Sequence, residues 1–168
     1  MPQKIFTKNE YNSGDGMMTS IWGPPLWHTL HTISFNYPVK PTKEEKDNYY
    51  LYFNSLQGVL PCRYCRDNLK KNWKSLPLKK SVFKNRDTLS KYVYDLHELV
   101  NKMLNKKSNL SYQQVRDRYE NFRSRCLDKK KNNSKKESGC TSSLYGVKGK
   151  CILNIVPKNN KSSIQIDP

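Results

Sequence analysis

Apolar residues recur at helical spacing in five separate stretches of this chain, and this pattern restricts its fold more than any other feature. Helix-start signals, such as the capping-box patterns that begin at Thr42 and Ser111, and proline-containing breaks lie between the stretches. The stripes predict helices over about 24–36, 42–60, 61–76, 87–104 and 111–122. No convincing pair of strands is predicted among them. The sequence therefore predicts an all-α bundle.

Cys62 and Cys65 are the pair of residues that can carry electron chemistry. They follow Pro61, where the second predicted helix gives way to the third, and a regular helix would place both thiols on one face, within reach of a disulfide. The helix dipole, Arg63 and Arg66 would favour a thiolate. A redox-active dithiol is one interpretation. A structural zinc pair and two inert thiols are the alternatives.

The composition narrows the class of protein. The formal net charge is +17, and both the first 127 residues and the remainder are basic, which allows contact with nucleic acid, acidic partners or an anionic membrane. No nucleic-acid recognition module is visible, so any such contact is expected to be non-specific. The chain has neither a run of membrane-spanning length nor a signal-peptide core near its start. Without secretion, five cysteines favour catalysis or metal over a disulfide framework.

Two other uses of the dithiol are less favoured. A thioredoxin-like fold would place the motif after a strand. Zinc typically needs four ligands, and no metal site is expected because the remaining candidates are scattered: His28, His31, His97, Cys126, Cys140 and Cys151. A helical bundle would instead bring the dithiol together with a set suited to a flat heteroaromatic cofactor, a flavin being the natural choice: Trp27, His31, His97, Asn101 and Tyr119.

Four ordered blocks of sequence resemble the Erv/ALR family of FAD-linked sulfhydryl oxidases. They are Trp22-Gly23-Pro24-x-x-Trp27-x-x-x-His31, Tyr37-Pro38, Pro61-Cys62-x-x-Cys65 and His97-x-x-Val100-Asn101-x-x-Leu104-x-Lys106. The Trp-Gly-Pro opening resembles the short forms encoded by large DNA viruses. The resemblance implies a four-helix bundle that holds FAD, a short fifth helix across it, and a homodimer.

The resemblance also implies a reaction and a site. Cys62 would exchange with thiols of protein substrates, and Cys65, beside the flavin, would pass two electrons to FAD and then to molecular oxygen, giving hydrogen peroxide. The implied FAD-binding residues are Gly23, Trp27, His31, Tyr37, Cys65, His97, Asn101, Leu104, Lys106, Arg118 and Tyr119. Glu98, Leu99 and Tyr92 depart from the family's pattern, as does the lack of a second cysteine pair that would staple the fifth helix.

The predicted domain organisation has three parts: a flexible polar lead over 1–20, an oxidase-like domain over 21–127, and a basic, poorly ordered tail over 128–168. The tail begins with a lysine-rich linker, 129–136, too polar to order itself through burial. Segments 151–156 and 162–166 alternate like strands, so short strands and a disordered tail both fit.

Cys126, Cys140 and Cys151 lie outside the motif. A cysteine pair on a flexible tether could shuttle electrons to Cys62. A structural Cys126–Cys140 bridge and three inert thiols are the alternatives.

The remaining expectations concern the location of the protein and a second class of function. The viral resemblance implies a virion or a viral factory in host cytoplasm. The alternative function is a basic helical adaptor or nucleic-acid-binding protein whose two motif cysteines are structural or bind metal.

Overall fold

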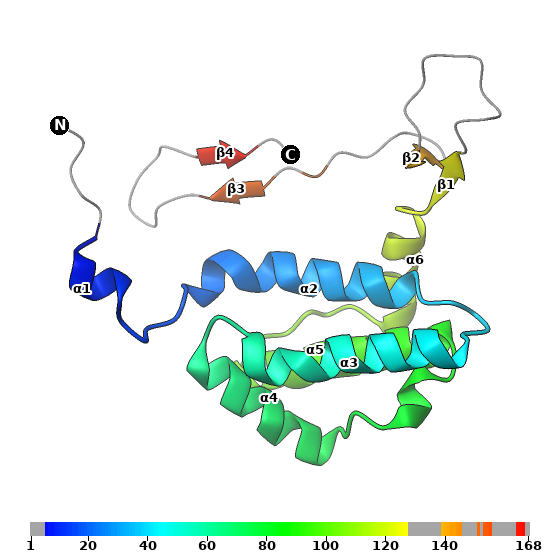
Figure 1. Ribbon diagram of the computed structural model, residues 1–168. Coiled ribbons are helices and arrows are strands. Elements are labelled where there is room, and N and C mark those ends of the chain that lie inside the picture. The colour runs from blue at the N-terminus through cyan, green and yellow to red at the C-terminus, as the bar shows by residue number, and fades with distance from the viewer. Residues whose placement is uncertain (1–5, 128–138, 146–150, 152, 156–163, 167–168) are drawn as a thin grey trace.

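The computed structural model describes residues 6–127, 139–145, 151, 153–155 and 164–166. Its long helices are α2 (Thr19–Phe35), α3 (Lys43–Val59), α4 (Arg63–Ser75) and α5 (Arg86–Met103). They form a bundle in which α2 packs on α5 and α3 packs on α4, and the shorter α6 (Tyr112–Glu120) lies against α2 and α5 at one end (Figure 1). The predicted all-α architecture, four helices with a short fifth, is confirmed.

Both predicted capping boxes form, and they explain where two helices begin. The Thr42 side chain accepts a hydrogen bond from the Glu45 backbone N–H at 3.2 Å, and Glu45 accepts one from the Thr42 N–H at 2.7 Å. Ser111 and Gln114 make the same reciprocal pair at the start of α6. Each box satisfies N–H groups that have no partner inside the helix.

Helix α2 begins earlier than the sequence predicts. The prolines were expected in its first turn, but the helix starts at Thr19 and carries Pro24 and Pro25 inside it. The extra turn is held because the Trp22 indole donates to the Met17 carbonyl at 3.0 Å and the Ile21 N–H donates to the Met18 carbonyl at 2.9 Å. These hydrogen bonds lie before the two prolines in the chain, so they do not need the backbone N–H groups that proline lacks.

Helix α5 differs from the prediction at both ends. Its cap is Asn85 rather than Asp87, because the Asn85 side chain accepts from the Thr88 N–H at 2.9 Å while the Thr88 hydroxyl accepts from the Asn85 N–H. Met103 and Leu104 were expected on the buried stripe but are 42% and 51% exposed, because the helix ends there.

The segment between α4 and α5, which the sequence left unassigned, forms a short 3-10 helix, η1 (Lys80–Phe83). It contacts α3 and α5 and inserts Phe83 into the core, where only 1% of that side chain is exposed. The Tyr37 hydroxyl donates to the Phe83 carbonyl at 2.9 Å. Phe83 thus acts as a plug that holds η1 against α3 and α5.

Strands appear where none were convincingly predicted. β1 (Ser124–Leu127) pairs antiparallel with β2 (Gly139–Ser143), and β3 (Leu153–Ile155) pairs antiparallel with β4 (Ile164–Ile166). The expectation of no strand pair is wrong for β1, whose partner follows the lysine-rich linker and so gave no local signal. In the last segment, short strands are the alternative observed. The linker, residues 129–136, lies outside the described residues.

The lead also holds a short element, α1 (Lys8–Tyr11), which was not predicted. Thr7 and Glu10 form a capping box at its start. The division of the chain into three parts stays a prediction.

Replacing Phe83 by alanine tests the role of η1. The Phe83→Ala change should lower the free energy of unfolding by about 3–5 kcal/mol, because it removes a buried ring and leaves a cavity. Phe6→Ala is the control, since Phe6 is 58% exposed, and should change that energy by less than about 0.5 kcal/mol. Denaturant unfolding followed by circular dichroism measures both. Equal losses in the two variants would contradict the packing described for η1.

Candidate active site

The two motif cysteines sit where α3 ends and α4 begins. Cys62 is the N-cap of α4, with extended backbone angles of φ −145° and ψ 122°. Its sulfur accepts a hydrogen bond from the Cys65 N–H at 3.3 Å. Both thiols are free and half-buried. The proline before Cys62 thus ends one helix, and the cysteine itself caps the next.

The two thiols differ in acidity. The pKa of Cys62 lies below its ordinary value, mainly because the Cys65 thiol hydrogen-bonds to it and also because backbone N–H groups do. The pKa of Cys65 lies above its ordinary value because of burial and because it faces Cys62. Cys62 is therefore the thiol that ionises first, as an attacking or exchanging sulfur should.

The arginines contribute less than the sequence suggested. The Arg66 charge only weakly opposes the burial that raises the pKa of Cys65, and the Arg66 guanidinium donates to the Leu60 carbonyl. The Arg63 guanidinium lies over the exposed Tyr64 ring, 5.3 Å from its centre. Hydrogen bonds at the helix start, rather than these charges, set the acidity of Cys62.

A second group of predicted residues meets between α2 and α5. The Trp27 and His97 rings stack with 4.0 Å between centres and 4° between planes. His31 Nε2 lies 3.0 Å from His97 Nδ1, within a hydrogen bond. The Tyr119 ring of α6 packs on His31, with centres 5.2 Å apart. We call Trp27, His31, His97 and Tyr119 the ring cluster.

His31 is the buried member of the ring cluster, with 4% of its surface exposed. Its pKa falls to about 4, first because of burial and then because His97 and His28 are close. The imidazole is therefore neutral at pH 7. Its Nδ1 is buried and has no hydrogen-bond partner among the described residues. An unpaired buried polar atom is costly, so this nitrogen is able to accept or donate one further hydrogen bond.

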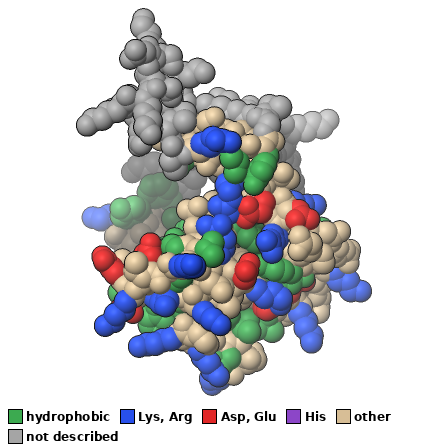
Figure 2. Space-filling model, turned by 90° about the vertical axis from the view of Figure 1, so that its right-hand side faces the viewer, with side chains coloured by type: hydrophobic (Ala, Val, Ile, Leu, Met, Phe, Trp, Pro, Cys, Tyr) green, Lys and Arg blue, Asp and Glu red, His purple; other side chains and the backbone are tan. Residues whose placement is uncertain are grey.

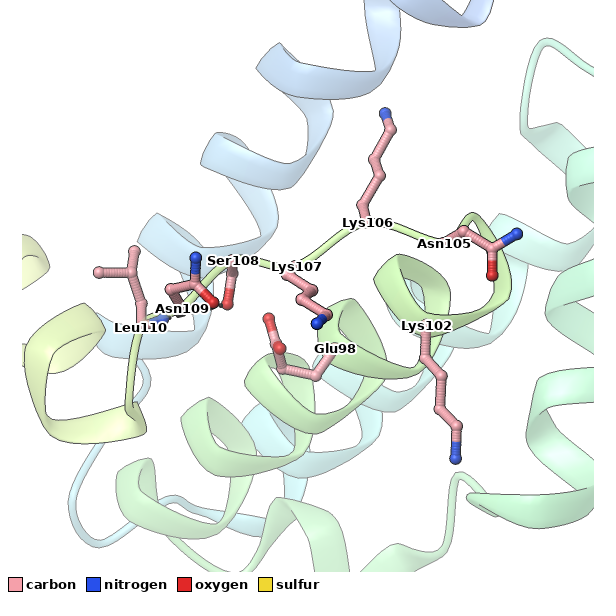
Figure 3. A pocket seen from close by; sticks show the side chains of 8 residues that line it. All are labelled: Glu98, Lys102, Asn105, Lys106, Lys107, Ser108, Asn109 and Leu110. Atoms are coloured by element: carbon pink, nitrogen blue, oxygen red, sulfur yellow. Dashed lines mark hydrogen bonds between the residues drawn. The ribbon is translucent and has the colours of Figure 1, made fainter.

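A basic loop follows α5 and borders a cavity of about 580 Å³. Its lining residues are Glu98, Lys102, Asn105, Lys106, Lys107, Ser108, Asn109 and Leu110. Asn105 and Asn109 both have φ 54°, in the left-handed region, which bends the loop. Lys106 on the loop and Lys102 in the last turn of α5 point in opposite directions, while Lys107 and Glu98 point toward each other (Figure 3). Three lysines thus line this cavity without converging on one point, and their positive charge suits an anionic group.

Residues that line the cavity act on His97 of the ring cluster. The pKa of His97 is lowered chiefly by burial. The Glu98 charge raises this pKa, and the Lys106 charge lowers it further. The Asn101 amide donates to Glu98 at 3.0 Å, and the Lys106 N–H donates to the Asn101 carbonyl at 2.8 Å. Asn101 therefore holds the start of the basic loop next to the histidine pair.

Other predicted site residues lie elsewhere. Tyr37 is fully buried in the core beside Tyr49 and Phe83 and is not in ring contact with the ring cluster. Gly23 has room for a side chain, since an added Cβ would meet only the Thr19 methyl group at 3.6 Å. Leu104 is exposed at the end of α5, and Arg118 lies on α6 beside Tyr119.

The residues that depart from the family's pattern have definite places. Tyr92 is buried and its hydroxyl donates to the Leu76 carbonyl at 3.1 Å. Glu98 accepts from Asn101 and lines the cavity. Leu99, half-buried, follows it on α5.

Sequence reasoning missed two members of the site. His28 Nδ1 lies 3.2 Å from the Tyr119 hydroxyl, and the Phe35 ring stacks on Tyr119 with centres 5.2 Å apart. Both stand about one turn from His31 on the same helix, and this spacing was the available signal.

The remaining cysteines divide into different states. Cys140, in β2, is disulfide-bonded, whereas Cys151 is free and exposed. Cys126 lies in β1, the strand that pairs with β2. The strand pairing supports the predicted Cys126–Cys140 bridge, which stays a prediction, as does the shuttle.

The described residues offer neither a metal-binding cluster nor a helix suited to crossing a membrane. Within the described residues, no three or more His, Cys, Asp or Glu side chains gather in a way that could hold a metal ion. Of the described helices, none combines the length and apolar character that crossing a membrane needs.

Comparison with known proteins gives consistent results. The model of the Erv1 / Alr family matches residues 24–120. A protein of Acanthamoeba polyphaga mimivirus, named as a probable FAD-linked sulfhydryl oxidase, is 40% identical over 86 residues, which cover 51% of this chain and 60% of that protein. The FAD-linked sulfhydryl oxidase ERV1 of Arabidopsis thaliana is 31% identical over 84 residues, covering 50% of this chain and 42% of that protein. The chain thus matches only part of either relative's length.

Solved structures share the fold. The crystal structure of the FAD binding domain of Erv1 from Saccharomyces cerevisiae superposes with a TM-score of 0.55 at 23% identity, covering 61% of this chain and 94% of that chain. The yeast Erv1 core gives a TM-score of 0.55 at 21% identity, with 70% and 96% covered.

Burial of the ring cluster predicts a pH dependence of stability. His31 has a folded pKa of about 4, below its unfolded value near 6.5. The unfolded chain therefore binds more protons between these values, and stability is complete above pH 6.5 and falls as the pH drops toward 4. We expect a loss of about 2 kcal/mol between pH 6.5 and 5. Denaturant unfolding at each pH measures it.

The variant His31→Gln should flatten this slope, because glutamine does not titrate. A wild-type stability that stays level from pH 6.5 to 5 would contradict the buried, neutral state of His31.

Proposed function

Because this chain belongs to the Erv1/Alr family, we propose that it is an FAD-dependent thiol oxidase that forms disulfide bonds in protein substrates. The observation that carries the proposal is the free, half-buried pair Cys62 and Cys65 at the start of α4, with the pKa of Cys62 lowered and that of Cys65 raised. Two thiols of unequal acidity in one helical turn suit thiol–disulfide exchange.

The exchange uses these two sulfurs in order. When the pair is oxidised, a substrate thiolate attacks Cys62, the Cys62–Cys65 bond breaks, and Cys65 leaves as a thiolate. The second substrate thiol, once deprotonated, attacks the substrate sulfur of the mixed disulfide and releases the Cys62 thiolate. The substrate has then lost two electrons and two protons, and the motif has gained two electrons.

The residues of the site fit FAD. The ring cluster offers flat surfaces and the unpaired His31 Nδ1, and the basic loop offers lysines for a diphosphate. Trp27, His31, His97 and Tyr119 would hold a ring system, and Asn101 and Lys106 would hold the adjoining polar part. Bound FAD supplies a two-electron acceptor that molecular oxygen reoxidises, with hydrogen peroxide as the product.

Partners and location follow as part of the same proposal. α3 leaves Leu51, Tyr52 and Val59 exposed, which supports a homodimer, since large exposed apolar side chains in one region mark interfaces. The similarity to a mimivirus protein supports action in host cytoplasm, in a viral factory, or in a virion.

The alternative class, a basic adaptor or nucleic-acid-binding protein, has less support. On the face shown in Figure 2, lysine and arginine side chains are scattered among acidic and hydrophobic ones rather than gathered in one stripe. Nucleic-acid-binding surfaces concentrate their basic residues.

Oxygen consumption with dithiothreitol tests the oxidase. The Cys65→Ser variant should fall to background, because no disulfide can form at the motif. Cys151→Ser is the matched control, since Cys151 is free and exposed, and should keep wild-type turnover on this small substrate. Retained turnover in Cys65→Ser would reject the electron path, and a colourless wild-type protein would reject the cofactor.

Flavin retention tests the ring cluster separately. The double variant His97→Ala, Asn101→Ala should bind FAD about ten- to a hundredfold more weakly, because a ring contact and a hydrogen bond are each worth about 1 kcal/mol. Flavin absorbance per protein measures retention, and circular dichroism should show unchanged helix content. Met103→Ala, on the same helix but exposed, is the control. Full occupancy in the double variant would remove these residues from the site.

A further inference from the structure

The segment just before α2 lies directly on the dithiol junction. An added Cβ at Gly16 would stand 2.5 Å from the Pro61 carbonyl oxygen and 3.1 Å from the Cys62 Cα. Both neighbours are backbone atoms, which cannot rotate away. The site therefore requires glycine at this position, where two stretches of backbone touch.

Hydrogen bonds fix the same segment on both sides. The Met17 N–H donates to the Pro61 carbonyl at 2.8 Å, and the Met17 carbonyl accepts from the Trp22 indole at 3.0 Å. The segment is thus tied to the residue before Cys62 and to the first turn of α2. We call residues 16–19 the strap.

The strap ends at Thr19, the first residue of α2, whose hydroxyl oxygen lies 3.9 Å from the Cys65 sulfur. A hydroxyl group donates more strongly to a thiolate than to a thiol, because the acceptor is charged. Burial raises the pKa of Cys65, and the Thr19 hydroxyl opposes that rise. Cys65 is the sulfur that must leave as a thiolate when the disulfide opens.

We propose that the strap positions the dithiol and that its Thr19 hydroxyl donates a hydrogen bond to the Cys65 sulfur as that sulfur leaves. This rests on the proposed thiol oxidase function. As a substrate thiolate forms a bond to Cys62, the Cys62–Cys65 bond breaks and its electron pair stays on the Cys65 sulfur, which then accepts a hydrogen bond from the Thr19 O–H. A better-stabilised leaving thiolate departs faster.

Thiol reactivity tests the strap without flavin or oxygen. The fully reduced full-length chain is treated with iodoacetamide over a range of pH, and peptide mass spectrometry follows Cys65 alone. Thr19→Val should raise the midpoint pH of Cys65 alkylation by about half to one unit, and Thr19→Ser should restore it. Thr29→Val is the control: Thr29 lies on the same helix, and its hydroxyl donates to the Pro25 carbonyl instead.

The rate at which glutathione opens the oxidised motif, measured by quenching the reaction at successive times, gives a second readout. Thr19→Val should slow the opening of the Cys62–Cys65 disulfide about threefold, in keeping with the leaving-group effect. Thr29→Val should leave the rate unchanged. An unchanged rate and an unchanged midpoint in Thr19→Val would overturn the role of Thr19.

Glycine variants test the backbone contact. Gly16→Ala should shift Cys65 alkylation in the same direction as Thr19→Val, because the clash lifts the strap. Gly14→Ala is the matched control, since nothing lies within 4 Å of its added Cβ. Wild-type behaviour of Gly16→Ala would refute the positioning role. If the alkylation midpoints shift in the variants but the wild-type protein consumes no oxygen, the role of the strap is supported and the oxidase function is rejected. If the wild-type protein consumes oxygen but the midpoints do not shift, the oxidase function is supported and the role of the strap is rejected.

Discussion

The seam between α2 and α5 is the contact on which the rest of the structure depends. Leu30 of α2 and Val93 and Leu96 of α5 are buried in it, and each such side chain contributes about 2 kcal/mol when removed from water. The same seam sets the distance between the two helices, and so it brings His31 within a hydrogen bond of His97. A change that separates these helices would therefore break the contacts of the ring cluster.

The position of the dithiol depends on a different feature, the junction between α3 and α4. Pro61 separates α3 from α4, and Cys62 then caps α4 through its sulfur. A cysteine that also serves as a cap is held by the helix it starts, so its sulfur keeps a fixed relation to the Cys65 N–H. The strap adds a constraint from the other side of the junction, through Met17 and Pro61. Redox chemistry at this point is therefore tied to both α2 and α4.

The positions of the charged residues matter more here than the net charge. The excess of lysine and arginine is spread widely over the chain, but Lys102, Lys106 and Lys107 line one cavity at the end of α5. Lys106 disfavours a proton on His97, after burial has already done so. Burial thus lowers the pKa of both histidines, and the basic loop adds to this at His97 while offering positive charge. This arrangement suits a ligand that is flat at one end and anionic at the other.

The sequence by itself determined the five helices of the bundle, the capping boxes at Thr42 and Ser111, the position of the dithiol, and the family, because these follow from local periodicity, short-range hydrogen bonds and motif spacing. Trp27, His31, His97 and Tyr119 could be named in advance for the same reason, and the structure does bring them together. Their roles toward FAD stay predictions. Tertiary structure alone decided the remaining features: the Phe83 plug, the pairing of β1 with β2, the burial that lowers the pKa of His31, and the strap across Pro61. Each of these arises from contacts between residues far apart in the chain, where no local pattern records which partner will be met.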